Sequence, residues 1–117
     1  MELKDALLGD VPTIVASGSV DDSTCGVLET ALRERLEARY NIVFLDLGEV
    51  TFMDAAGASV LTAWVQSLRG KGWLGIIAPS ADVRRLLEDE KVIGHPNVRL
   101  FETTHAARMV TGERQST

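Results

Sequence analysis

Residues 41–68, NIVFLDLGEVTFMDAAGASVLTAWVQSL, decide the fold. The first seven, Asn41–Leu47, are mostly apolar and β-branched without alternation, which is typical of a strand covered on both faces. From Ala55 to Leu68 the apolar residues recur at helical spacing and form one stripe, which a helix would bury. The stripe consists of Gly57, Val60, Leu61, Trp64, Val65 and Leu68. A buried strand followed by such a helix predicts an α/β domain.

The rest of the chain alternates between strand and helix patterns. The predicted strands are 2–8, 13–18, 73–78 and 97–101, and a turn at Gly9–Asp10 joins the first two as a hairpin. Further helices are predicted at 23–39, at 81–87 after the N-cap Ser80, and through Val110 after Thr103 or Thr104. Strands separated by helices run parallel. We therefore expect one domain over residues 1–111, a mixed, mostly parallel sheet of four to five strands with about four helices, and a flexible tail at 112–117.

Composition limits the classes of function. With 117 residues, 45% hydrophobic and 25% charged, the chain has the length and make-up of one globular domain. A formal net charge of −5 argues against nucleic-acid binding. Glu2 and Asp5 do not fit a signal peptide, and the uncharged residues 55–68 are too few and too polar to span a bilayer. With one cysteine, these features favour a cytoplasmic protein without membrane insertion.

Catalytic and metal-binding patterns are weak. His95 and His105 have no third ligand at metal spacing, so neither a metal nor a cofactor is predicted. Cys25 lies near a predicted helix start, but a small packed residue explains it better than a nucleophile. Asp46 ends a strand as a phosphoacceptor does in a receiver domain, yet only one helix fits between it and Asp21. A small enzyme or ligand-binding domain of flavodoxin-like shape, using Asp46 or Cys25, remains the least favoured alternative.

The start of the helix at 55–68 is the most informative candidate site. Asp54 is an N-cap by residue type, and the free N–H groups of Ala55, Ala56 and Gly57 would point outward there. The side of the helix opposite the apolar stripe is small and uncharged, which favours the close approach of another protein. A well-formed helix start, or cover by another part of the chain, is the alternative. That side carries Ala55, Ala58, Ser59, Thr62, Ala63 and Gln66, with Ala56 at its edge.

Three segments together resemble the STAS domain family of bacterial anti-anti-sigma factors, also called anti-sigma factor antagonists. VTFMDAAG at 50–57 resembles the family signature, and ASGSVDDST at 16–24 is similar to its strand and helix-start segment. WLGIIAPSADVRRLLE at 73–88, followed by VRLFETTHAARMV at 98–110, is similar to its C-terminal half. The resemblance extends from about Leu3 to Val110. It implies a STAS fold and a protein-binding, non-enzymatic role in partner switching, which controls transcription through a sigma factor.

The resemblance implies a partner and a set of site residues. The partner would be an anti-sigma factor that is also a serine kinase of the histidine-kinase-like ATPase type, and a homodimer is left open. The family's phosphoacceptor position falls on Ala56, which has no hydroxyl, so a phosphate switch at this position is not expected. Ser59 is the nearest substitute, and Ser23 and Thr24 are weaker ones. The predicted partner-binding residues are Asp21, Asp22, Ser23, Thr24, Asp54, Ala55, Ala56, Gly57, Ser59, Thr62 and Ala63.

A second interpretation keeps the family and changes the role. The chain would then be a STAS scaffold subunit of a larger stress-signalling or transporter-associated complex. An alanine at the acceptor position is equally compatible with such a role.

Overall fold

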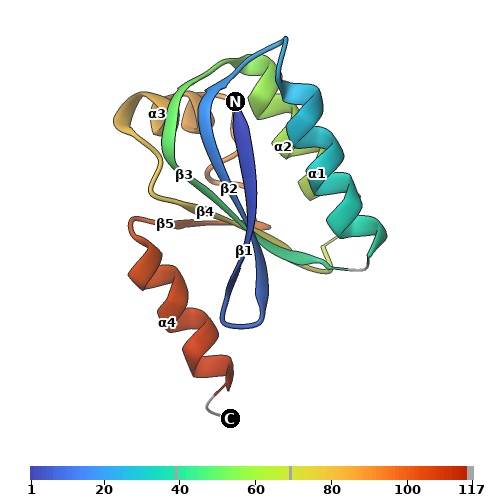
Figure 1. The fold of residues 1–117 in the computed structure, drawn as a ribbon, viewed down its shortest axis with the longest axis vertical. Helices are drawn as coiled ribbons and strands as arrows, with labels where there is room; N and C mark the ends of the chain where they lie inside the picture. The colour runs from blue at the N-terminus through green and yellow to red at the C-terminus, as the bar shows by residue number, and fades with distance from the viewer. Residues whose placement is uncertain (39, 69, 116–117) are drawn as a thin grey trace.

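The computed structural model describes residues 1–38, 40–68 and 70–115. Its elements alternate as the sequence predicts (Figure 1). In chain order they are β1 (Glu2–Leu8), β2 (Val11–Val20), α1 (Cys25–Glu37), β3 (Ile42–Met53), α2 (Ala55–Ser67), β4 (Trp73–Ile77), α3 (Ala81–Asp89), β5 (Val98–Phe101) and α4 (Thr104–Gln115).

The five strands form one sheet in the order β1-β2-β3-β4-β5. β1 and β2 are antiparallel and joined by the predicted turn, where Gly9 has a φ of 63°. The pairs β2–β3, β3–β4 and β4–β5 are all parallel. The predicted α/β class, with a mixed and mostly parallel sheet, is therefore confirmed.

Helices cover the two faces of the sheet unequally. The main core packs α1, α2 and α3 against one face, with Leu32, Leu61 and Leu87 fully buried. A smaller core on the other face holds Ala107 of α4 against Phe44 and Ile77. Phe44 meets Trp73 and Phe101 edge to face, with ring centroids 5.5 and 5.6 Å apart. α2 packs its apolar side into this main core, and its opposite side lies at the surface of the molecule.

β3 is longer than predicted. The sequence places its end before Gly48, but the strand continues to Met53 and pairs with a longer β2. Two register shifts interrupt that pairing, one after Val15 and one after Gly18. The consequence for the site is that Asp54 follows directly on a strand.

Helix α4 extends to Gln115, past Thr111, which is buried. Residues 116–117 lie outside the described residues. Helix α1 begins at Cys25 instead of Ser23, and its predicted last residue, Arg39, also lies outside the described residues.

Candidate functional site

Asp54 starts α2 as an N-cap. Its backbone is extended, and its Oδ1 accepts hydrogen bonds from the N–H groups of Ala56 (3.0 Å) and Gly57 (3.3 Å). The N–H of Asp54 donates to the carbonyl of Val20 at 3.1 Å. The predicted capping role is confirmed, and the backbone bond also ties the start of α2 to the end of β2.

Gly57 lets α2 approach the sheet closely. A Cβ at this position would lie 2.9 Å from Val20 Cγ1 and 3.0 Å from Met53 Cγ, which is closer than carbon atoms normally come. Because Val20 and Met53 are paired at the ends of β2 and β3, this contact sets the depth at which α2 begins. Gly57 is buried, so it supports the site from beneath and is not available for direct contact.

The outer side of α2 is mostly open, as predicted. Ala55, Ser59 and Ala63 are exposed, and Ala56 and Thr62 are half-buried. We call these five residues the α2 face. Gln66 continues it as an exposed residue. Ala58 is a correction, because it is only 1% exposed and packs in the main core, where α3 lies against α2.

Hollows lie on both sides of the α2 face. A cavity of about 310 Å³ runs along one side, between α2 and Glu90 at the end of α3. A smaller one of about 170 Å³ lies between α1 and α2, next to Trp64. Ala63 lines both cavities. Ser59 and Thr62 also line the first cavity, so the small side chains of the α2 face border hollows that can admit larger side chains of another protein.

The loop after β2 is ordered around Asp21. Its Oδ1 accepts hydrogen bonds from the Ser23 N–H (3.0 Å) and the Ser23 hydroxyl (2.7 Å). The Thr24 hydroxyl oxygen accepts from the Asp21 N–H at 2.9 Å and lies 2.9 Å from the Ser19 carbonyl, to which it donates. The hydrogen bond from the Ser23 hydroxyl is the main reason that the pKa of Asp21 lies below its ordinary value.

Asp21 and Asp22, an acidic pair just before α1, do not cap this helix. Thr24 occupies the N-cap position and makes no side-chain capping bond there. Asp21 instead closes the turn before the helix, and Asp22 is exposed. The reason is position, because α1 begins at Cys25, so Asp21 lies three residues before the N-cap Thr24 and bonds Ser23 within the loop.

The loop and the α2 face emerge at the same end of the sheet. Val20 and Met53 are partners in the parallel β2–β3 pair, so the segments that follow them begin side by side. Both lie at the top of the view in Figure 1. The structure thus brings together the two regions that the sequence predicts to form one site.

The hydroxyl groups near the site differ in accessibility. Ala56, at the predicted acceptor position, is half-buried and carries only a methyl group. Ser59 is exposed on the α2 face, whereas Thr24 is half-buried and engaged with Ser19. Ser23 is exposed but bound to Asp21.

The enzyme-like candidates do not converge on a cavity. Asp46 accepts a hydrogen bond from the Gly48 N–H at 2.9 Å, and Cys25 is half-buried at the start of α1. Neither side chain lines the two cavities beside the α2 face. His95 accepts from the Asn97 N–H at 3.0 Å within its loop. Among the described residues, no group of three histidine, cysteine or acidic side chains is placed to hold a metal.

Sequence reasoning missed two apolar residues near this end of the sheet. Phe52, two residues before Asp54, is 52% exposed, and Val27 in the first turn of α1 is 56% exposed. The exposure of Phe52 could not be predicted from the sequence, because it depends on the extension of β3 to Met53.

In the part of the chain that the structure describes, no helix is long and apolar enough to cross a membrane.

Comparison with known proteins identifies the fold and the family. A family model described as "Mlab, STAS domain" matches residues 3–90. An anti-sigma factor antagonist from Mycobacterium paratuberculosis superposes with a TM-score of 0.83 at 21% identity, covering 94% of this chain and 92% of that one. A candidate anti-sigma factor antagonist from Thermotoga maritima gives a TM-score of 0.82 at 18% identity, with 93% of each chain covered.

A transporter contains a similar unit. The murine Slc26a9 anion transporter in its inward-facing state gives a TM-score of 0.72 at 14% identity, covering 88% of this chain and 18% of that one. The search of curated proteins found no match. The family model covers most of the chain, and the two antagonist structures share its fold. The chain therefore belongs to the STAS domain family.

Proposed function

We propose that this chain is a non-enzymatic, protein-binding module that acts as an anti-sigma factor antagonist. Its partner is an anti-sigma factor of the serine-kinase type, which it binds through the α2 face and the loop at 21–24. The observation that carries the proposal is the exposure of the α2 face, an uncharged patch of small side chains at a helix surface. Exposed helix surfaces usually carry Lys and Glu, so this composition favours a partner that covers it.

Two features support this mode of docking. Small side chains let a partner backbone come close, and the cavities on either side of Ala63 offer room for larger partner side chains. Asp54 and Gly57 then act from below, because they fix the position of α2 against β2. We assign them a positioning role.

Ala56 sets the proposed regulation. A phosphate adds about two negative charges and considerable bulk, which would disrupt a patch of small uncharged residues. Ala56 cannot carry one, so the module stays competent to bind unless Ser59 is modified instead. We therefore expect that the kinase does not phosphorylate position 56 and does not weaken binding there.

A single substitution tests the docking surface. Ala63→Arg places a long charged side chain on the α2 face between the two cavities, and we expect at least a hundredfold loss of affinity for the kinase-type anti-sigma factor from the native cell. Ala38→Arg, an exposed alanine at the other end of α1, is the matched control and should bind as the parent does. Calorimetric titration measures both, and equal affinities for the two variants would overturn the proposed surface.

Modification is tested separately. The chain is incubated with that kinase and ATP, and phosphate is located by mass spectrometry. We expect none at residues 54–59 in the parent, and phosphate at position 56 with weaker binding in Ala56→Ser. Stoichiometric phosphate on Ser59 of the parent would contradict permanent competence.

The second candidate is a scaffold subunit of a transporter-associated or stress-signalling complex. The description of the matching family model and the similarity to part of the Slc26a9 transporter favour it. Affinity purification from the native cell distinguishes the two roles. Recovery of a histidine-kinase-like ATPase supports the first candidate, and recovery of other STAS chains or membrane components supports the second.

A further inference from the structure

β1 leaves one side of the sheet unpaired. It is the outermost strand, it is seven residues long, and within the described residues only β2 pairs with it. Figure 1 shows β1 in front of the other strands. An unpaired strand of this length presents a row of backbone donors and acceptors that another strand can use.

The hairpin turn determines which residues face this edge. Leu8 and Val11 flank the two-residue turn and are direct partners, so the backbone groups of Leu8 are expected to face β2. Along a strand, the backbone groups of successive residues point alternately to its two sides. The N–H and C=O groups of Leu3, Asp5 and Leu7 therefore point outward, away from β2. Three ladder positions on β1 are therefore available to a second strand.

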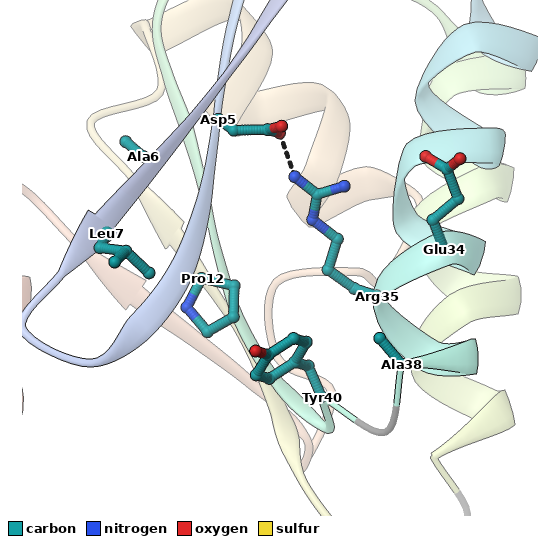
Figure 2. Close-up of a pocket in the computed structure, with 8 residues that line it drawn as sticks. All are labelled: Asp5, Ala6, Leu7, Pro12, Glu34, Arg35, Ala38 and Tyr40. Atoms are coloured by element: carbon teal, nitrogen blue, oxygen red, sulfur yellow. Dashed lines mark hydrogen bonds and ion pairs between the residues drawn. The ribbon is translucent and has the colours of Figure 1, made fainter.

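A groove lies beside this edge. Figure 2 shows the cavity of about 580 Å³ between the β1–β2 hairpin and the C-terminal part of α1. Leu7 and Tyr40 line it and are 68% and 50% exposed, although both are large and apolar. Arg35 reaches from α1 to Asp5 and forms an ion pair with it. The edge thus combines free backbone groups, exposed apolar side chains and one internally neutralised charge.

We propose that a second copy of this chain pairs with β1 in the antiparallel direction, about a two-fold axis at Asp5. Asp5 is the middle residue of Glu2–Leu8, so all seven residues of each copy overlap in this register. Leu3 of each copy then lies opposite Leu7 of the other, and Lys4 lies opposite Ala6. Leu3 is half-buried on the same face as Leu7, so each pair covers apolar surface that the monomer leaves in water.

The length of overlap and the charges favour this register over the registers centred on Lys4 and on Ala6. The two Asp5 side chains meet at the axis, and each is paired with its own Arg35, which offsets the repulsion between these like charges. Centring on Lys4 or on Ala6 shortens the overlap, and centring on Lys4 would also oppose two lysines. A second copy supplies both the full seven-residue overlap and the Leu3–Leu7 pairs, which favours it over a foreign peptide as the occupant.

The expected dimer is weak. One strand pair with a few flanking side chains belongs to the smallest class of interfaces, below about 1,200 Å². We expect dissociation constants between about 10 µM and 1 mM. Because the α2 face is not part of this edge, dimerisation and partner binding are independent.

Analytical ultracentrifugation of the full chain from 10 µM to 2 mM tests the proposal. The apparent mass should rise from 12.7 kDa toward twice that value. Leu7→Lys, at an exposed edge position, should weaken the dimer at least tenfold. Met109→Lys, at a 54% exposed position on α4, is the matched control and should dimerise as the parent does. A monomer at every concentration, or equal dimerisation of the two variants, would overturn the proposal.

Amide exchange tests the register. Dimerisation should slow exchange at Leu3, Asp5 and Leu7 and leave Lys4 and Ala6 unchanged, because the latter already face β2. A dimer without this alternation would also overturn the proposal.

Discussion

At the scale of single residues, three residues fix the backbone of the candidate site. Gly57 has no side chain, which lets α2 pack closely on Val20 and Met53. The Asp54 carboxylate accepts two backbone N–H groups at the start of α2, and the Asp21 carboxylate accepts the Ser23 N–H in the loop after β2. Each fixes a backbone position from which the exposed residues project. Substitutions here should therefore act on stability and on the geometry of the loop.

Two glycines in helices allow a matched test of close packing. Gly57→Ala should destabilise the fold by about 1–3 kcal/mol, because its methyl group would press on Val20 and Met53. A Cβ at Gly26 in α1 would have no atom within 4 Å. Gly26→Ala should therefore stabilise the fold by about 0.5–1 kcal/mol through helix propensity. Urea unfolding of both variants measures the difference. A Gly57→Ala variant as stable as the parent would show that α2 does not begin against β2.

The loop after β2 should respond to acid. The pKa of Asp21 is lowered in the folded state, so its hydrogen bonds are present above the ordinary value of 3.8 and are lost as pH falls through the lower folded value. Ser23→Ala removes the largest cause, and the pKa of Asp21 should rise toward 3.8. An NMR titration of the Asp21 carboxyl measures both proteins. The same midpoint in the two would show that Ser23 does not hold the carboxylate.

At the scale of elements, helix ends and strand lengths separate what sequence predicts from what packing decides. The start of α2 and the Ser80 cap of α3 were predictable, because a capping side chain acts within three residues. The end of β3 was not, because its continuation past Gly48 depends on pairing with β2 through two register shifts. The start of α1 was not predictable either, because Asp21 and Ser23 form a hydrogen-bonded loop and the helix begins only at Cys25.

The end of α3 contains a strained residue that can be relieved. Lys91 has a φ of 62°, its N–H donates to the Glu88 carbonyl, and the Val92 N–H donates to the Leu87 carbonyl, which is a Schellman motif. Glycine is favoured at this position, so Lys91→Gly should stabilise by about 0.5–1 kcal/mol. Lys91→Ala, which keeps the strain, should be nearly neutral. Thermal unfolding measures both, and equal melting temperatures would argue against this helix end.

At the scale of the whole molecule, the fold was predictable and the site was only partly so. Buried strands alternating with amphipathic helices specify the α/β class and the parallel order. The outer side of α2 follows from helical periodicity, which correctly exposes Ala55, Ser59 and Ala63. Periodicity fails at Ala58, because α3 covers that flank, and it gives no sign of the cavities, which depend on how three helices meet.

The most direct measurement of the central claim is hydrogen–deuterium exchange of the full chain with and without the purified kinase-type anti-sigma factor. We predict slower exchange in the first turns of α2 and in the loop at 21–24, with β1 and α4 unchanged. Protection confined to β1 or α4, with α2 exchanging as in the free protein, would contradict the account.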